Sequence, residues 1–492
     1  MAGSWAELFG LLFIYFAAAL STIFTAILYT LPSHYESSEE APISEDDFAE
    51  TDKTRPCPGL TYLHKYRGDG KTAQPSTSVT ILVLGDIGRS PRMQYHATSI
   101  ASHGGRVELV GYAESDVLPE IQASPLINIV ALKAVPERLR TSSKALFPII
   151  GPLKVLYQIW NLYHTLAYKA KATKFMLVQN PPSIPTLLVG QLVCFLRCTK
   201  LIIDWHNLGH TILALKLGKK HALVKMSEAY ESYIAKYAFG HFAVSQAMAK
   251  LLKQRYGIEA QPLYDRPARQ FQPLTAAQRS ALLAKVPETA KHAIDIQQDR
   301  WKLLVSSTSW TPDEDFSILL DALVAYSATV NMEPSYPKLL VIITGKGPLK
   351  GYYLEKIEKL NKHKKLLHCH IRTAWLSMED YAGLLGSADL GVSLHMSSSG
   401  VDLPMKVVDM FGAACPVIGW DNFAAWPELV QEGVNGMGFQ DASSLSTLLE
   451  TLFANGGAKL EKLRSGALIE SRRRWEDEWP TAAKVLGIKL ET

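Results

Sequence analysis

The chain of 492 residues is too long for one ordinary domain, and its 47% of hydrophobic residues can supply the cores of two. Charged residues make up 20%, which excludes global disorder, and the small formal net charge of +4 does not suggest a nucleic-acid-binding protein. The five cysteines lack the spacing of a zinc site and predict reduced thiols in a reducing compartment: Cys57, Cys194, Cys198, Cys369 and Cys415.

The first 33 residues predict a membrane anchor. No charged residue occurs from Leu8 to Ser33, and the apolar segment Leu8–Leu31 is long enough to cross a bilayer as a helix. A cleaved signal peptide is the weaker alternative, because the segment lacks a basic start and is too long for the apolar region of such a peptide. The basic residues between Lys53 and Lys71 predict that the bulk of the chain is cytosolic.

Residues 34–76 have the composition of a flexible linker. An acidic run extends from Glu36 to Asp52, and sequence rich in proline and glycine follows it. Acidic, weakly apolar sequence is usually solvated, so we expect this segment to hold the rest of the chain away from an anionic membrane surface.

Residues 77–264 predict a first Rossmann-like domain. Short apolar runs alternate with helical windows, beginning with a strand at Val79–Leu84 and a helix at Met93–His103, and this rhythm indicates a parallel, doubly wound sheet. Further strands are predicted at Arg106–Val110, Leu126–Ala131, Lys174–Gln179, Lys200–Trp205 and His241–Val244.

Two strand ends of this domain carry candidate functional residues. After the first strand, Gly88 permits close approach of a ligand, and Arg89 and Arg92 are candidates for phosphate binding. Asp86 in the same loop is a candidate base; an ordinary turn with surface arginines is the alternative. At the end of Lys200–Trp205, His206 is the first candidate for a general base, and a histidine hydrogen-bonded in a loop is the alternative.

Two stretches of mixed basic and apolar residues, 133–174 and 215–225, have the composition of sequence that lies on anionic lipid. Two solvated helix faces are the commoner structure for such sequence. Because a membrane anchor is predicted upstream, we keep both interpretations.

A second Rossmann-like domain is predicted at 301–455, after a polar connection at 265–300. Two such domains in tandem form a cleft between the carboxyl ends of their strands. Residues 456–492 predict a helix, at Lys459–Trp475, that packs back on the first domain. Strands are predicted at Leu303–Ser306, Leu339–Ile343, Leu366–Ile371, Asp389–Leu394 and Pro416–Gly419, with a helix at Asp315–Ala328.

Three segments of this second domain predict a sugar-nucleotide site. Ser309 lies in a hydroxyl-rich loop after the first strand, and Lys346 lies between two glycines after the second. A helix that begins near Pro404 points its free N–H groups at an anion, with Lys406 adding a charge and Asp409 able to accept hydrogen bonds from a ribose diol. The alternative is an amphipathic helix on which Lys406 and Asp409 are merely exposed to solvent.

The motifs LVLGDIGRSPRMQYHATSIA, DWHN, SSTSWTPDEDF, GKGP and SGVDLPMKVVDMFG occur in this order. Together they resemble the chitobiosyldiphosphodolichol β-mannosyltransferase family, from the N-terminal span to about Gly436. The resemblance implies an α/β GT-B fold with one N-terminal transmembrane helix, on the cytosolic side of the endoplasmic reticulum membrane. It implies transfer of mannose from GDP-mannose to GlcNAc2-diphosphodolichol with inversion, as the first β-1,4-mannose for protein N-glycosylation, and no tightly bound metal.

The resemblance also assigns roles to particular residues. Asp409 occupies the second of two carboxylate positions found in related GT-B enzymes, whereas the first falls on Val401, with Asp402 one place further on. Asp402 and Glu428 are therefore assigned to donor binding together with Asp409, although the sequence around Glu428 is less typical of the family. Other dolichol-pathway mannosyltransferases are expected partners.

Two other functions fit the same motifs. Another membrane-bound GT-B enzyme, such as a phosphatidylinositol sugar transferase, shares the fold and the donor loops. A non-catalytic glycosyltransferase-like subunit is a different class, and the presence of the predicted anion-binding residues argues against it. The sequence does not specify the general base, the oligomeric state or the docking of the lipid acceptor.

Overall fold

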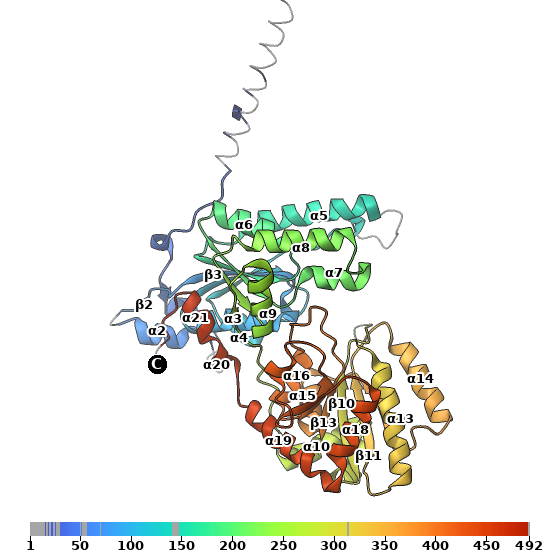
Figure 1. Cartoon of the computed structure of the whole chain (residues 1–492). Coiled ribbons are helices and arrows are strands. Elements are labelled where there is room, and N and C mark those ends of the chain that lie inside the picture. Colours follow the sequence, from blue (N-terminus) through green and yellow to red (C-terminus); the bar gives the residue numbers. More distant parts are fainter. Residues whose placement is uncertain are drawn as a thin grey trace, which may run out of the picture. The chain divides into compact units, whose positions relative to one another are not determined.

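The structure is a computed structural model of the chain (Figure 1). It describes residues 30–49, 51, 57–68, 70–139, 147–311 and 314–490, together with residues 15, 18, 21, 22 and 25. Most of the predicted span Leu8–Leu31 therefore lies outside the described residues. Within the part of the chain that the structure describes, no helix has both the length and the apolar character needed to cross a bilayer.

The chain divides into two compact units. The first comprises Met1–Ile203, Tyr237–Phe239 and Leu486–Thr492, and the second comprises Asp204–Lys236 and Gly240–Val485. The C-terminal residues belong to the first unit, where the Thr77 hydroxyl donates a hydrogen bond of 3.4 Å to the carbonyl oxygen of Leu486.

The first sheet has seven strands in the order β5-β4-β3-β6-β7-β8-β9. Strand β3 (Ser78–Asp86) lies inside the sheet and pairs in parallel with both β4 and β6, so that Val79 lies opposite Val107 and Phe175. Residues 79–83 of β3 are buried, because neighbours cover both faces of a central parallel strand. The other strands are β4 (Arg106–Tyr112), β5 (Ile127–Ala131), β6 (Phe175–Asn180), β7 (Lys200–Trp205), β8 (Gly240–Ala243) and β9 (Gln261–Pro262).

Helices follow most of these strands, as the sequence pattern predicts. Helix α3 begins with a proline at its first position, where the missing N–H costs nothing. The helices of this part of the chain are α3 (Pro91–Ser102), α4 (Pro119–Ala123), α5 (Phe147–His164), α6 (Thr186–Leu196), α7 (Gly209–Leu217), α8 (Ala222–Ala235) and α9 (Gln246–Leu251).

The second sheet has six strands in the order β12-β11-β10-β13-β14-β15, and its neighbours run parallel. The prediction of two parallel sheets is therefore confirmed. Its strands are β10 (Trp301–Ser307), β11 (Lys338–Thr344), β12 (Cys369–Ala374), β13 (Leu390–Ser393), β14 (Val417–Trp420) and β15 (Gly436–Phe439). The main helices are α13 (Phe316–Met332), α14 (Lys350–Lys362), α15 (Met378–Ser387), α16 (Met405–Gly412), α18 (Ala442–Phe453) and α19 (Ala458–Glu470).

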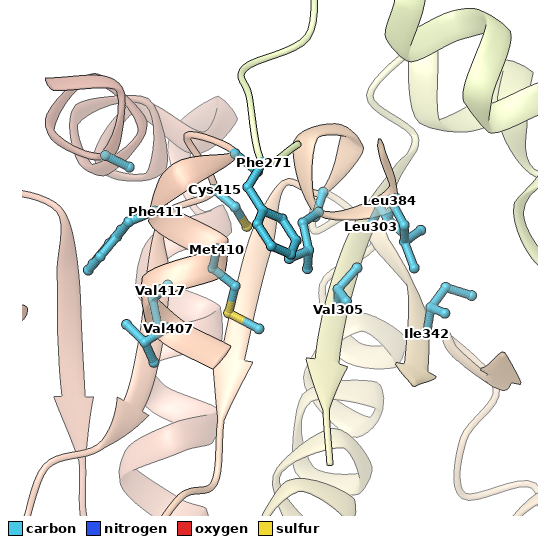
Figure 2. Packing of buried hydrophobic residues seen from close by; sticks show 14 of the residues in the cluster. Phe271, Leu303, Val305, Ile342, Leu384, Val407, Met410, Phe411, Cys415 and Val417 are labelled. Carbon is cyan, nitrogen blue, oxygen red and sulfur yellow. The ribbon is translucent and has the colours of Figure 1, made fainter. Parts of the chain in front are cut away.

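The core on one face of this sheet positions helix α16. Leu303 and Val305 of β10 point into the cluster that also contains Met410 of α16 (Figure 2). Leu304, between them, belongs to the cluster on the opposite face, as the period of two in a strand requires. A side chain added at Gly391 of β13 would lie 2.5 Å from the sulfur of Met410. The glycine therefore lets α16 lie close to the sheet, which fixes the start of that helix above the strand ends.

Part of the expected linker at 34–76 is folded. Helix α2 (Leu60–Tyr66) buries Leu63 completely, and β1 (Ile43–Ser44) pairs antiparallel with β2 (Thr72–Ala73). These elements could not be predicted from the overall composition of the segment. A few apolar residues among many acidic ones are enough to anchor short elements on the first unit.

The predicted helix at Lys459–Trp475 is interrupted. Helix α19 ends at Glu470, and α20 (Trp475–Glu478) begins after Arg474, whose backbone is extended. The Arg474 N–H donates a hydrogen bond of 2.7 Å to the carboxylate of Asp477, so a capping interaction starts a new helix there.

Candidate active site

A buried carboxylate, Glu314, joins two of the predicted donor-binding residues in the second unit. Only 4% of Glu314 is exposed. It accepts hydrogen bonds from the Ser309 N–H, at 2.8 Å, and from the Thr308 hydroxyl, and it forms an ion pair with Lys406 in the first turn of α16. Ser309 and Lys406 therefore meet at one carboxylate, as expected for residues that follow neighbouring strand ends. Glu314 itself was not among the predicted site residues.

Lys346 lies in the loop after β11, with its ammonium nitrogen 3.8 Å from the centre of the exposed Trp375 ring. The glycines on either side of it are required by packing. A side chain at Gly345 would lie 1.8 Å from the Thr308 carbonyl oxygen, and one at Gly347 would lie 1.7 Å from that of Ser309. The loops after β10 and β11 thus touch through their backbones, and the exposed Lys346 lies beside this contact.

Asp409 lies one turn after Lys406 on α16. Burial raises the pKa of Asp409 to about 8, and the neighbouring carboxylate of Asp265 adds to this effect. Among the described residues, none donates a hydrogen bond to its side chain. Asp409 is half-buried, so its carboxyl group can be reached by a ligand and is available to accept hydrogen bonds from it.

Asp402 stabilises the loop that follows β13. It accepts hydrogen bonds from His395, at 3.1 Å, from Ser399, at 3.0 Å, and from Ser397. Burial acts to raise its pKa, but the hydrogen bonds, led by that of His395, hold the pKa below its usual value. Three of its roughly four acceptor sites are therefore used within its own loop, and this geometry does not favour direct donor binding.

His206 follows β7, and its Nε2 atom lies 3.0 Å from the carboxylate of the fully buried Asp204. The carboxylate fixes the orientation of the imidazole, as a general base requires. The next residue, Asn207, donates a hydrogen bond of 3.3 Å to the Ser398 hydroxyl, so the loop of His206 contacts the loop of Asp402 within the second unit. The structure thus contains two neighbouring histidine–aspartate pairs, and the His395 pair was not predicted.

In the first unit, Asp86 organises the loop after β3. Its carboxylate accepts hydrogen bonds from the backbone N–H groups of Gly88, Glu114 and Ser115, at 3.2 to 3.3 Å. Hydrogen bonding by Ser115 is the main reason that the pKa of Asp86 lies below its ordinary value. The exposed Arg89 lies 3.3 Å from the same carboxylate. This geometry suits a structural anchor better than a base.

The two remaining residues of that loop are closely packed. A side chain at Gly88 would lie 2.7 Å from the Ser115 carbonyl oxygen, so the glycine is needed for the contact between two loops of the protein. Arg92 lies on α3 and is buried. Their assignment to the donor stays a prediction.

Glu428 has a different place from the one expected. Its carboxylate accepts hydrogen bonds of 2.6 Å from the backbone N–H groups of both Gln246 and Ala247, and one of 3.0 Å from the Tyr264 hydroxyl. It therefore neutralises the first N–H groups of helix α9, a typical position for an acidic residue. Three of its roughly four acceptor sites are thus used inside the second unit, so the contacts of Glu428 favour a role in the fold over donor binding.

No protein-family model matches the chain. Named relatives match most of it. A chitobiosyldiphosphodolichol beta-mannosyltransferase of Arthroderma benhamiae is 54% identical over 382 residues, covering 76% of this chain and 85% of the relative. One of the same name from Yarrowia lipolytica is 46% identical over 430 residues, covering 86% and 89%. The chain belongs to the chitobiosyldiphosphodolichol beta-mannosyltransferase family.

Solved structures confirm the fold of this family member. Anabaena Alr3699/HepE, solved in complex with UDP and glucose, matches with a TM-score of 0.58 at 14% identity, over 83% of this chain and 99% of that one. Sucrose-phosphate synthase from Thermosynechococcus elongatus matches with a TM-score of 0.57 at 16% identity, over 83% and 97%. These likenesses show the fold alone, and with the two parallel sheets they identify it as GT-B.

The position of Glu428 leads to a prediction about stability. Replacing Glu428 with glutamine removes the charge at the start of α9, and we expect the free energy of unfolding to fall by about 1–2 kcal/mol. The KM for the sugar donor should stay within about twofold, because the carboxylate is used inside the protein. Chemical denaturation and donor titration measure the two effects.

The exposed Glu379, replaced by glutamine, is the matched control for this substitution. A large increase in donor KM for Glu428→Gln without loss of stability would instead place Glu428 in the donor site.

Proposed function

We propose that this protein transfers mannose from GDP-mannose to the chitobiose of GlcNAc2-diphosphodolichol and forms a β-1,4 linkage with inversion. The observation that carries the proposal is the identity of 54% and 46%, over most of the chain, with enzymes named chitobiosyldiphosphodolichol beta-mannosyltransferase. That name denotes a mannosyltransferase acting on lipid-linked chitobiose. The name specifies neither the GDP donor nor the inversion. We propose both from the residues of the second unit.

The donor side of the proposal uses α16 and the two loops beside it. Asp409 accepts hydrogen bonds from the ribose hydroxyls, which replace the donors that its carboxylate lacks within the described residues. Lys406 and Lys346 bind the diphosphate, and the N–H groups at the start of α16 add their partial positive charge. When the diphosphate binds, Lys406 exchanges part of its ion pair with Glu314 for the incoming negative charge.

The base in this proposal is His206. Its imidazole takes the proton from the acceptor 4-hydroxyl group as that oxygen attacks the anomeric carbon of mannose. The bond from this carbon to the GDP oxygen breaks in the same step, so a single displacement converts the α-linked donor into a β-linked product. Asp204 holds the ring and stabilises the imidazolium that forms. Asp86 is the alternative base, but its lowered pKa makes it a weaker acceptor of the proton.

We also propose that catalysis needs no resident metal, because lysines and a helix N-terminus balance the charge of the leaving GDP. The described residues contain no group of three His, Cys, Asp or Glu side chains placed to hold a metal ion. The predicted span at Leu8–Leu31 anchors the enzyme in the endoplasmic reticulum membrane with both units in the cytosol. Other dolichol-pathway mannosyltransferases are proposed partners, since they consume the product.

The donor nucleotide is the part of the proposal that most needs a test. A relative from Arabidopsis thaliana, 40% identical with 82% of this chain and 96% of the relative covered, is named UDP-glycosyltransferase TURAN. The test is competition between GDP-mannose and UDP-glucose for the purified protein, with phytanyl-diphosphate chitobiose as acceptor. We expect transfer of mannose only, with GDP as product inhibitor. Transfer of glucose from UDP-glucose, or binding without any transfer, would refute the proposed reaction.

A further inference from the structure

Helix α5 presents an apolar stripe to solvent. Leu153, Leu156 and Trp160 follow one another at intervals of three and four residues, which places them on one side of the helix. Their exposed fractions are 49%, 61% and 63%. Single exposed apolar residues are common on protein surfaces, but an ordered row that includes a tryptophan is not.

Helix α6 carries a second stripe of the same kind. Leu188, Leu192 and Phe195 are spaced by four and three residues, and 79% of Phe195 is exposed. The two helices pack against each other in the first unit, and Figure 1 shows them along the same edge of that unit. We call these six side chains together the α5–α6 surface.

The charge of the surrounding sequence is strongly one-sided. From Arg138 to Ile203 the chain contains nine lysines and arginines and not one aspartate or glutamate. Lys154 on α5 is exposed beside the stripe, and Lys169 and Lys171 are exposed just after the helix. Exposed apolar and aromatic side chains in a segment whose charged residues are all positive match the headgroup region of a bilayer that contains anionic lipid.

The chain that follows the apolar N-terminal segment is attached next to this surface. The Tyr168 hydroxyl donates a hydrogen bond of 2.7 Å to the Thr30 carbonyl oxygen. The buried Arg197, directly after α6, donates one of 3.1 Å to the Ser33 carbonyl oxygen, and its own carbonyl accepts one of 2.8 Å from the Tyr35 N–H. The point at which the apolar segment ends is thus fixed between the ends of α5 and α6.

We propose that the α5–α6 surface is a second membrane contact, which lies in the headgroup region of an anionic bilayer. Bound in this way, the first unit is held to the bilayer by two sites and has a fixed orientation, whereas one anchor would let it rotate. The proposal does not depend on the donor, the acceptor or the base proposed above. It commits to lipid as the occupant, because the uniform positive charge and the adjoining apolar segment both favour lipid over a protein partner.

The experiment places a probe at the surface of the full-length protein in vesicles that contain phosphatidylserine. Leu156→Cys and Phe195→Cys, each combined with Cys198→Ser to remove the exposed native thiol, are labelled with an environment-sensitive fluorophore. Lipids carrying a shallow nitroxide group quench a fluorophore that enters the bilayer. Met332→Cys, at an apolar side chain of the second unit that is 78% exposed, is the control for exposure.

We expect quenching at positions 156 and 195 to exceed that at position 332 by about threefold or more, and to weaken in neutral phosphatidylcholine vesicles. In a Leu188→Glu/Leu192→Glu background, the label at position 195 should lose this quenching while the circular dichroism spectrum is retained. Equal quenching at all three positions would overturn the proposal. Protection from soluble iodide without quenching by lipid would also overturn it, because a protein would then cover the surface.

Discussion

Replacing His206 with alanine is expected to lower kcat by about 10²- to 10⁴-fold, the usual contribution of a general base. The KM for GDP-mannose should change little, because His206 acts on the acceptor hydroxyl and not on the nucleotide. The expectation depends on the 3.0 Å contact between His206 and the buried Asp204, which orients the imidazole. Steady-state kinetics with a lipid-linked chitobiose acceptor, together with calorimetric binding of GDP, separate the two effects.

Added imidazole distinguishes a missing base from a damaged fold. We expect imidazole to restore part of the activity of His206→Ala, because it supplies the absent group in solution. His395→Ala is the matched control, since it also removes a histidine paired with an aspartate in the same unit, at 3.1 Å from Asp402. If imidazole rescued His395→Ala and had no effect on His206→Ala, the base would be His395.

Replacing Asp409 with asparagine is expected to raise the KM for GDP-mannose by about 10- to 100-fold, because two hydrogen bonds from the ribose to a charged acceptor are weakened. The effect should depend on pH. The pKa of Asp409 is about 8 without ligand, so at neutral pH the group carries a proton. Since ribose hydroxyls favour the ionised carboxylate, donor affinity of the wild type should rise from pH 6.5 to pH 8.5. An equally steep rise in Asp409→Asn would remove Asp409 from the ribose site.

The same pKa predicts how stability varies with pH. The folded protein binds a proton at Asp409 that the unfolded chain, with an ordinary aspartate, releases near pH 4. The contribution of Asp409 to the free energy of unfolding is therefore fully present below about pH 4, and it is lost as the pH rises to about 8. We expect the Tm of Asp409→Asn to fall less than that of the wild type between pH 5.5 and pH 8.5. Parallel decreases would show that Asp409 is ionised in the folded protein.

The strands were predictable where they are buried. Lys200–Trp205 coincides with β7, and Leu339–Ile343 lies within β11, because central parallel strands are short apolar runs between helices. Strands β9 and β15 were missed. Strand β9 has two residues, one of them proline, and β15 reads Gly-Met-Gly-Phe, so neither shows the apolar or β-branched run that predicts a strand.

The candidate site was predictable in its positions and less so in its contacts. Ser309, Lys346 and Lys406 were found because loops at the carboxyl ends of parallel strands meet at one edge. Glu314, the carboxylate that contacts both Ser309 and Lys406, was not predicted. An acidic residue before a helix usually interacts only with the helix dipole. The contact of Glu428 with Gln246 joins residues 182 positions apart, and no local pattern encodes such a pairing.

The most direct test of the proposed reaction is the analysis of its product. Purified protein is incubated with radiolabelled GDP-mannose and phytanyl-diphosphate chitobiose, with and without EDTA, and the product is treated with α- or β-mannosidase. We predict one added mannose that β-mannosidase alone removes, formed equally in both incubations. A product removed by α-mannosidase would contradict inversion, a product lost with EDTA would contradict metal-independent catalysis, and no product would contradict the proposed function itself.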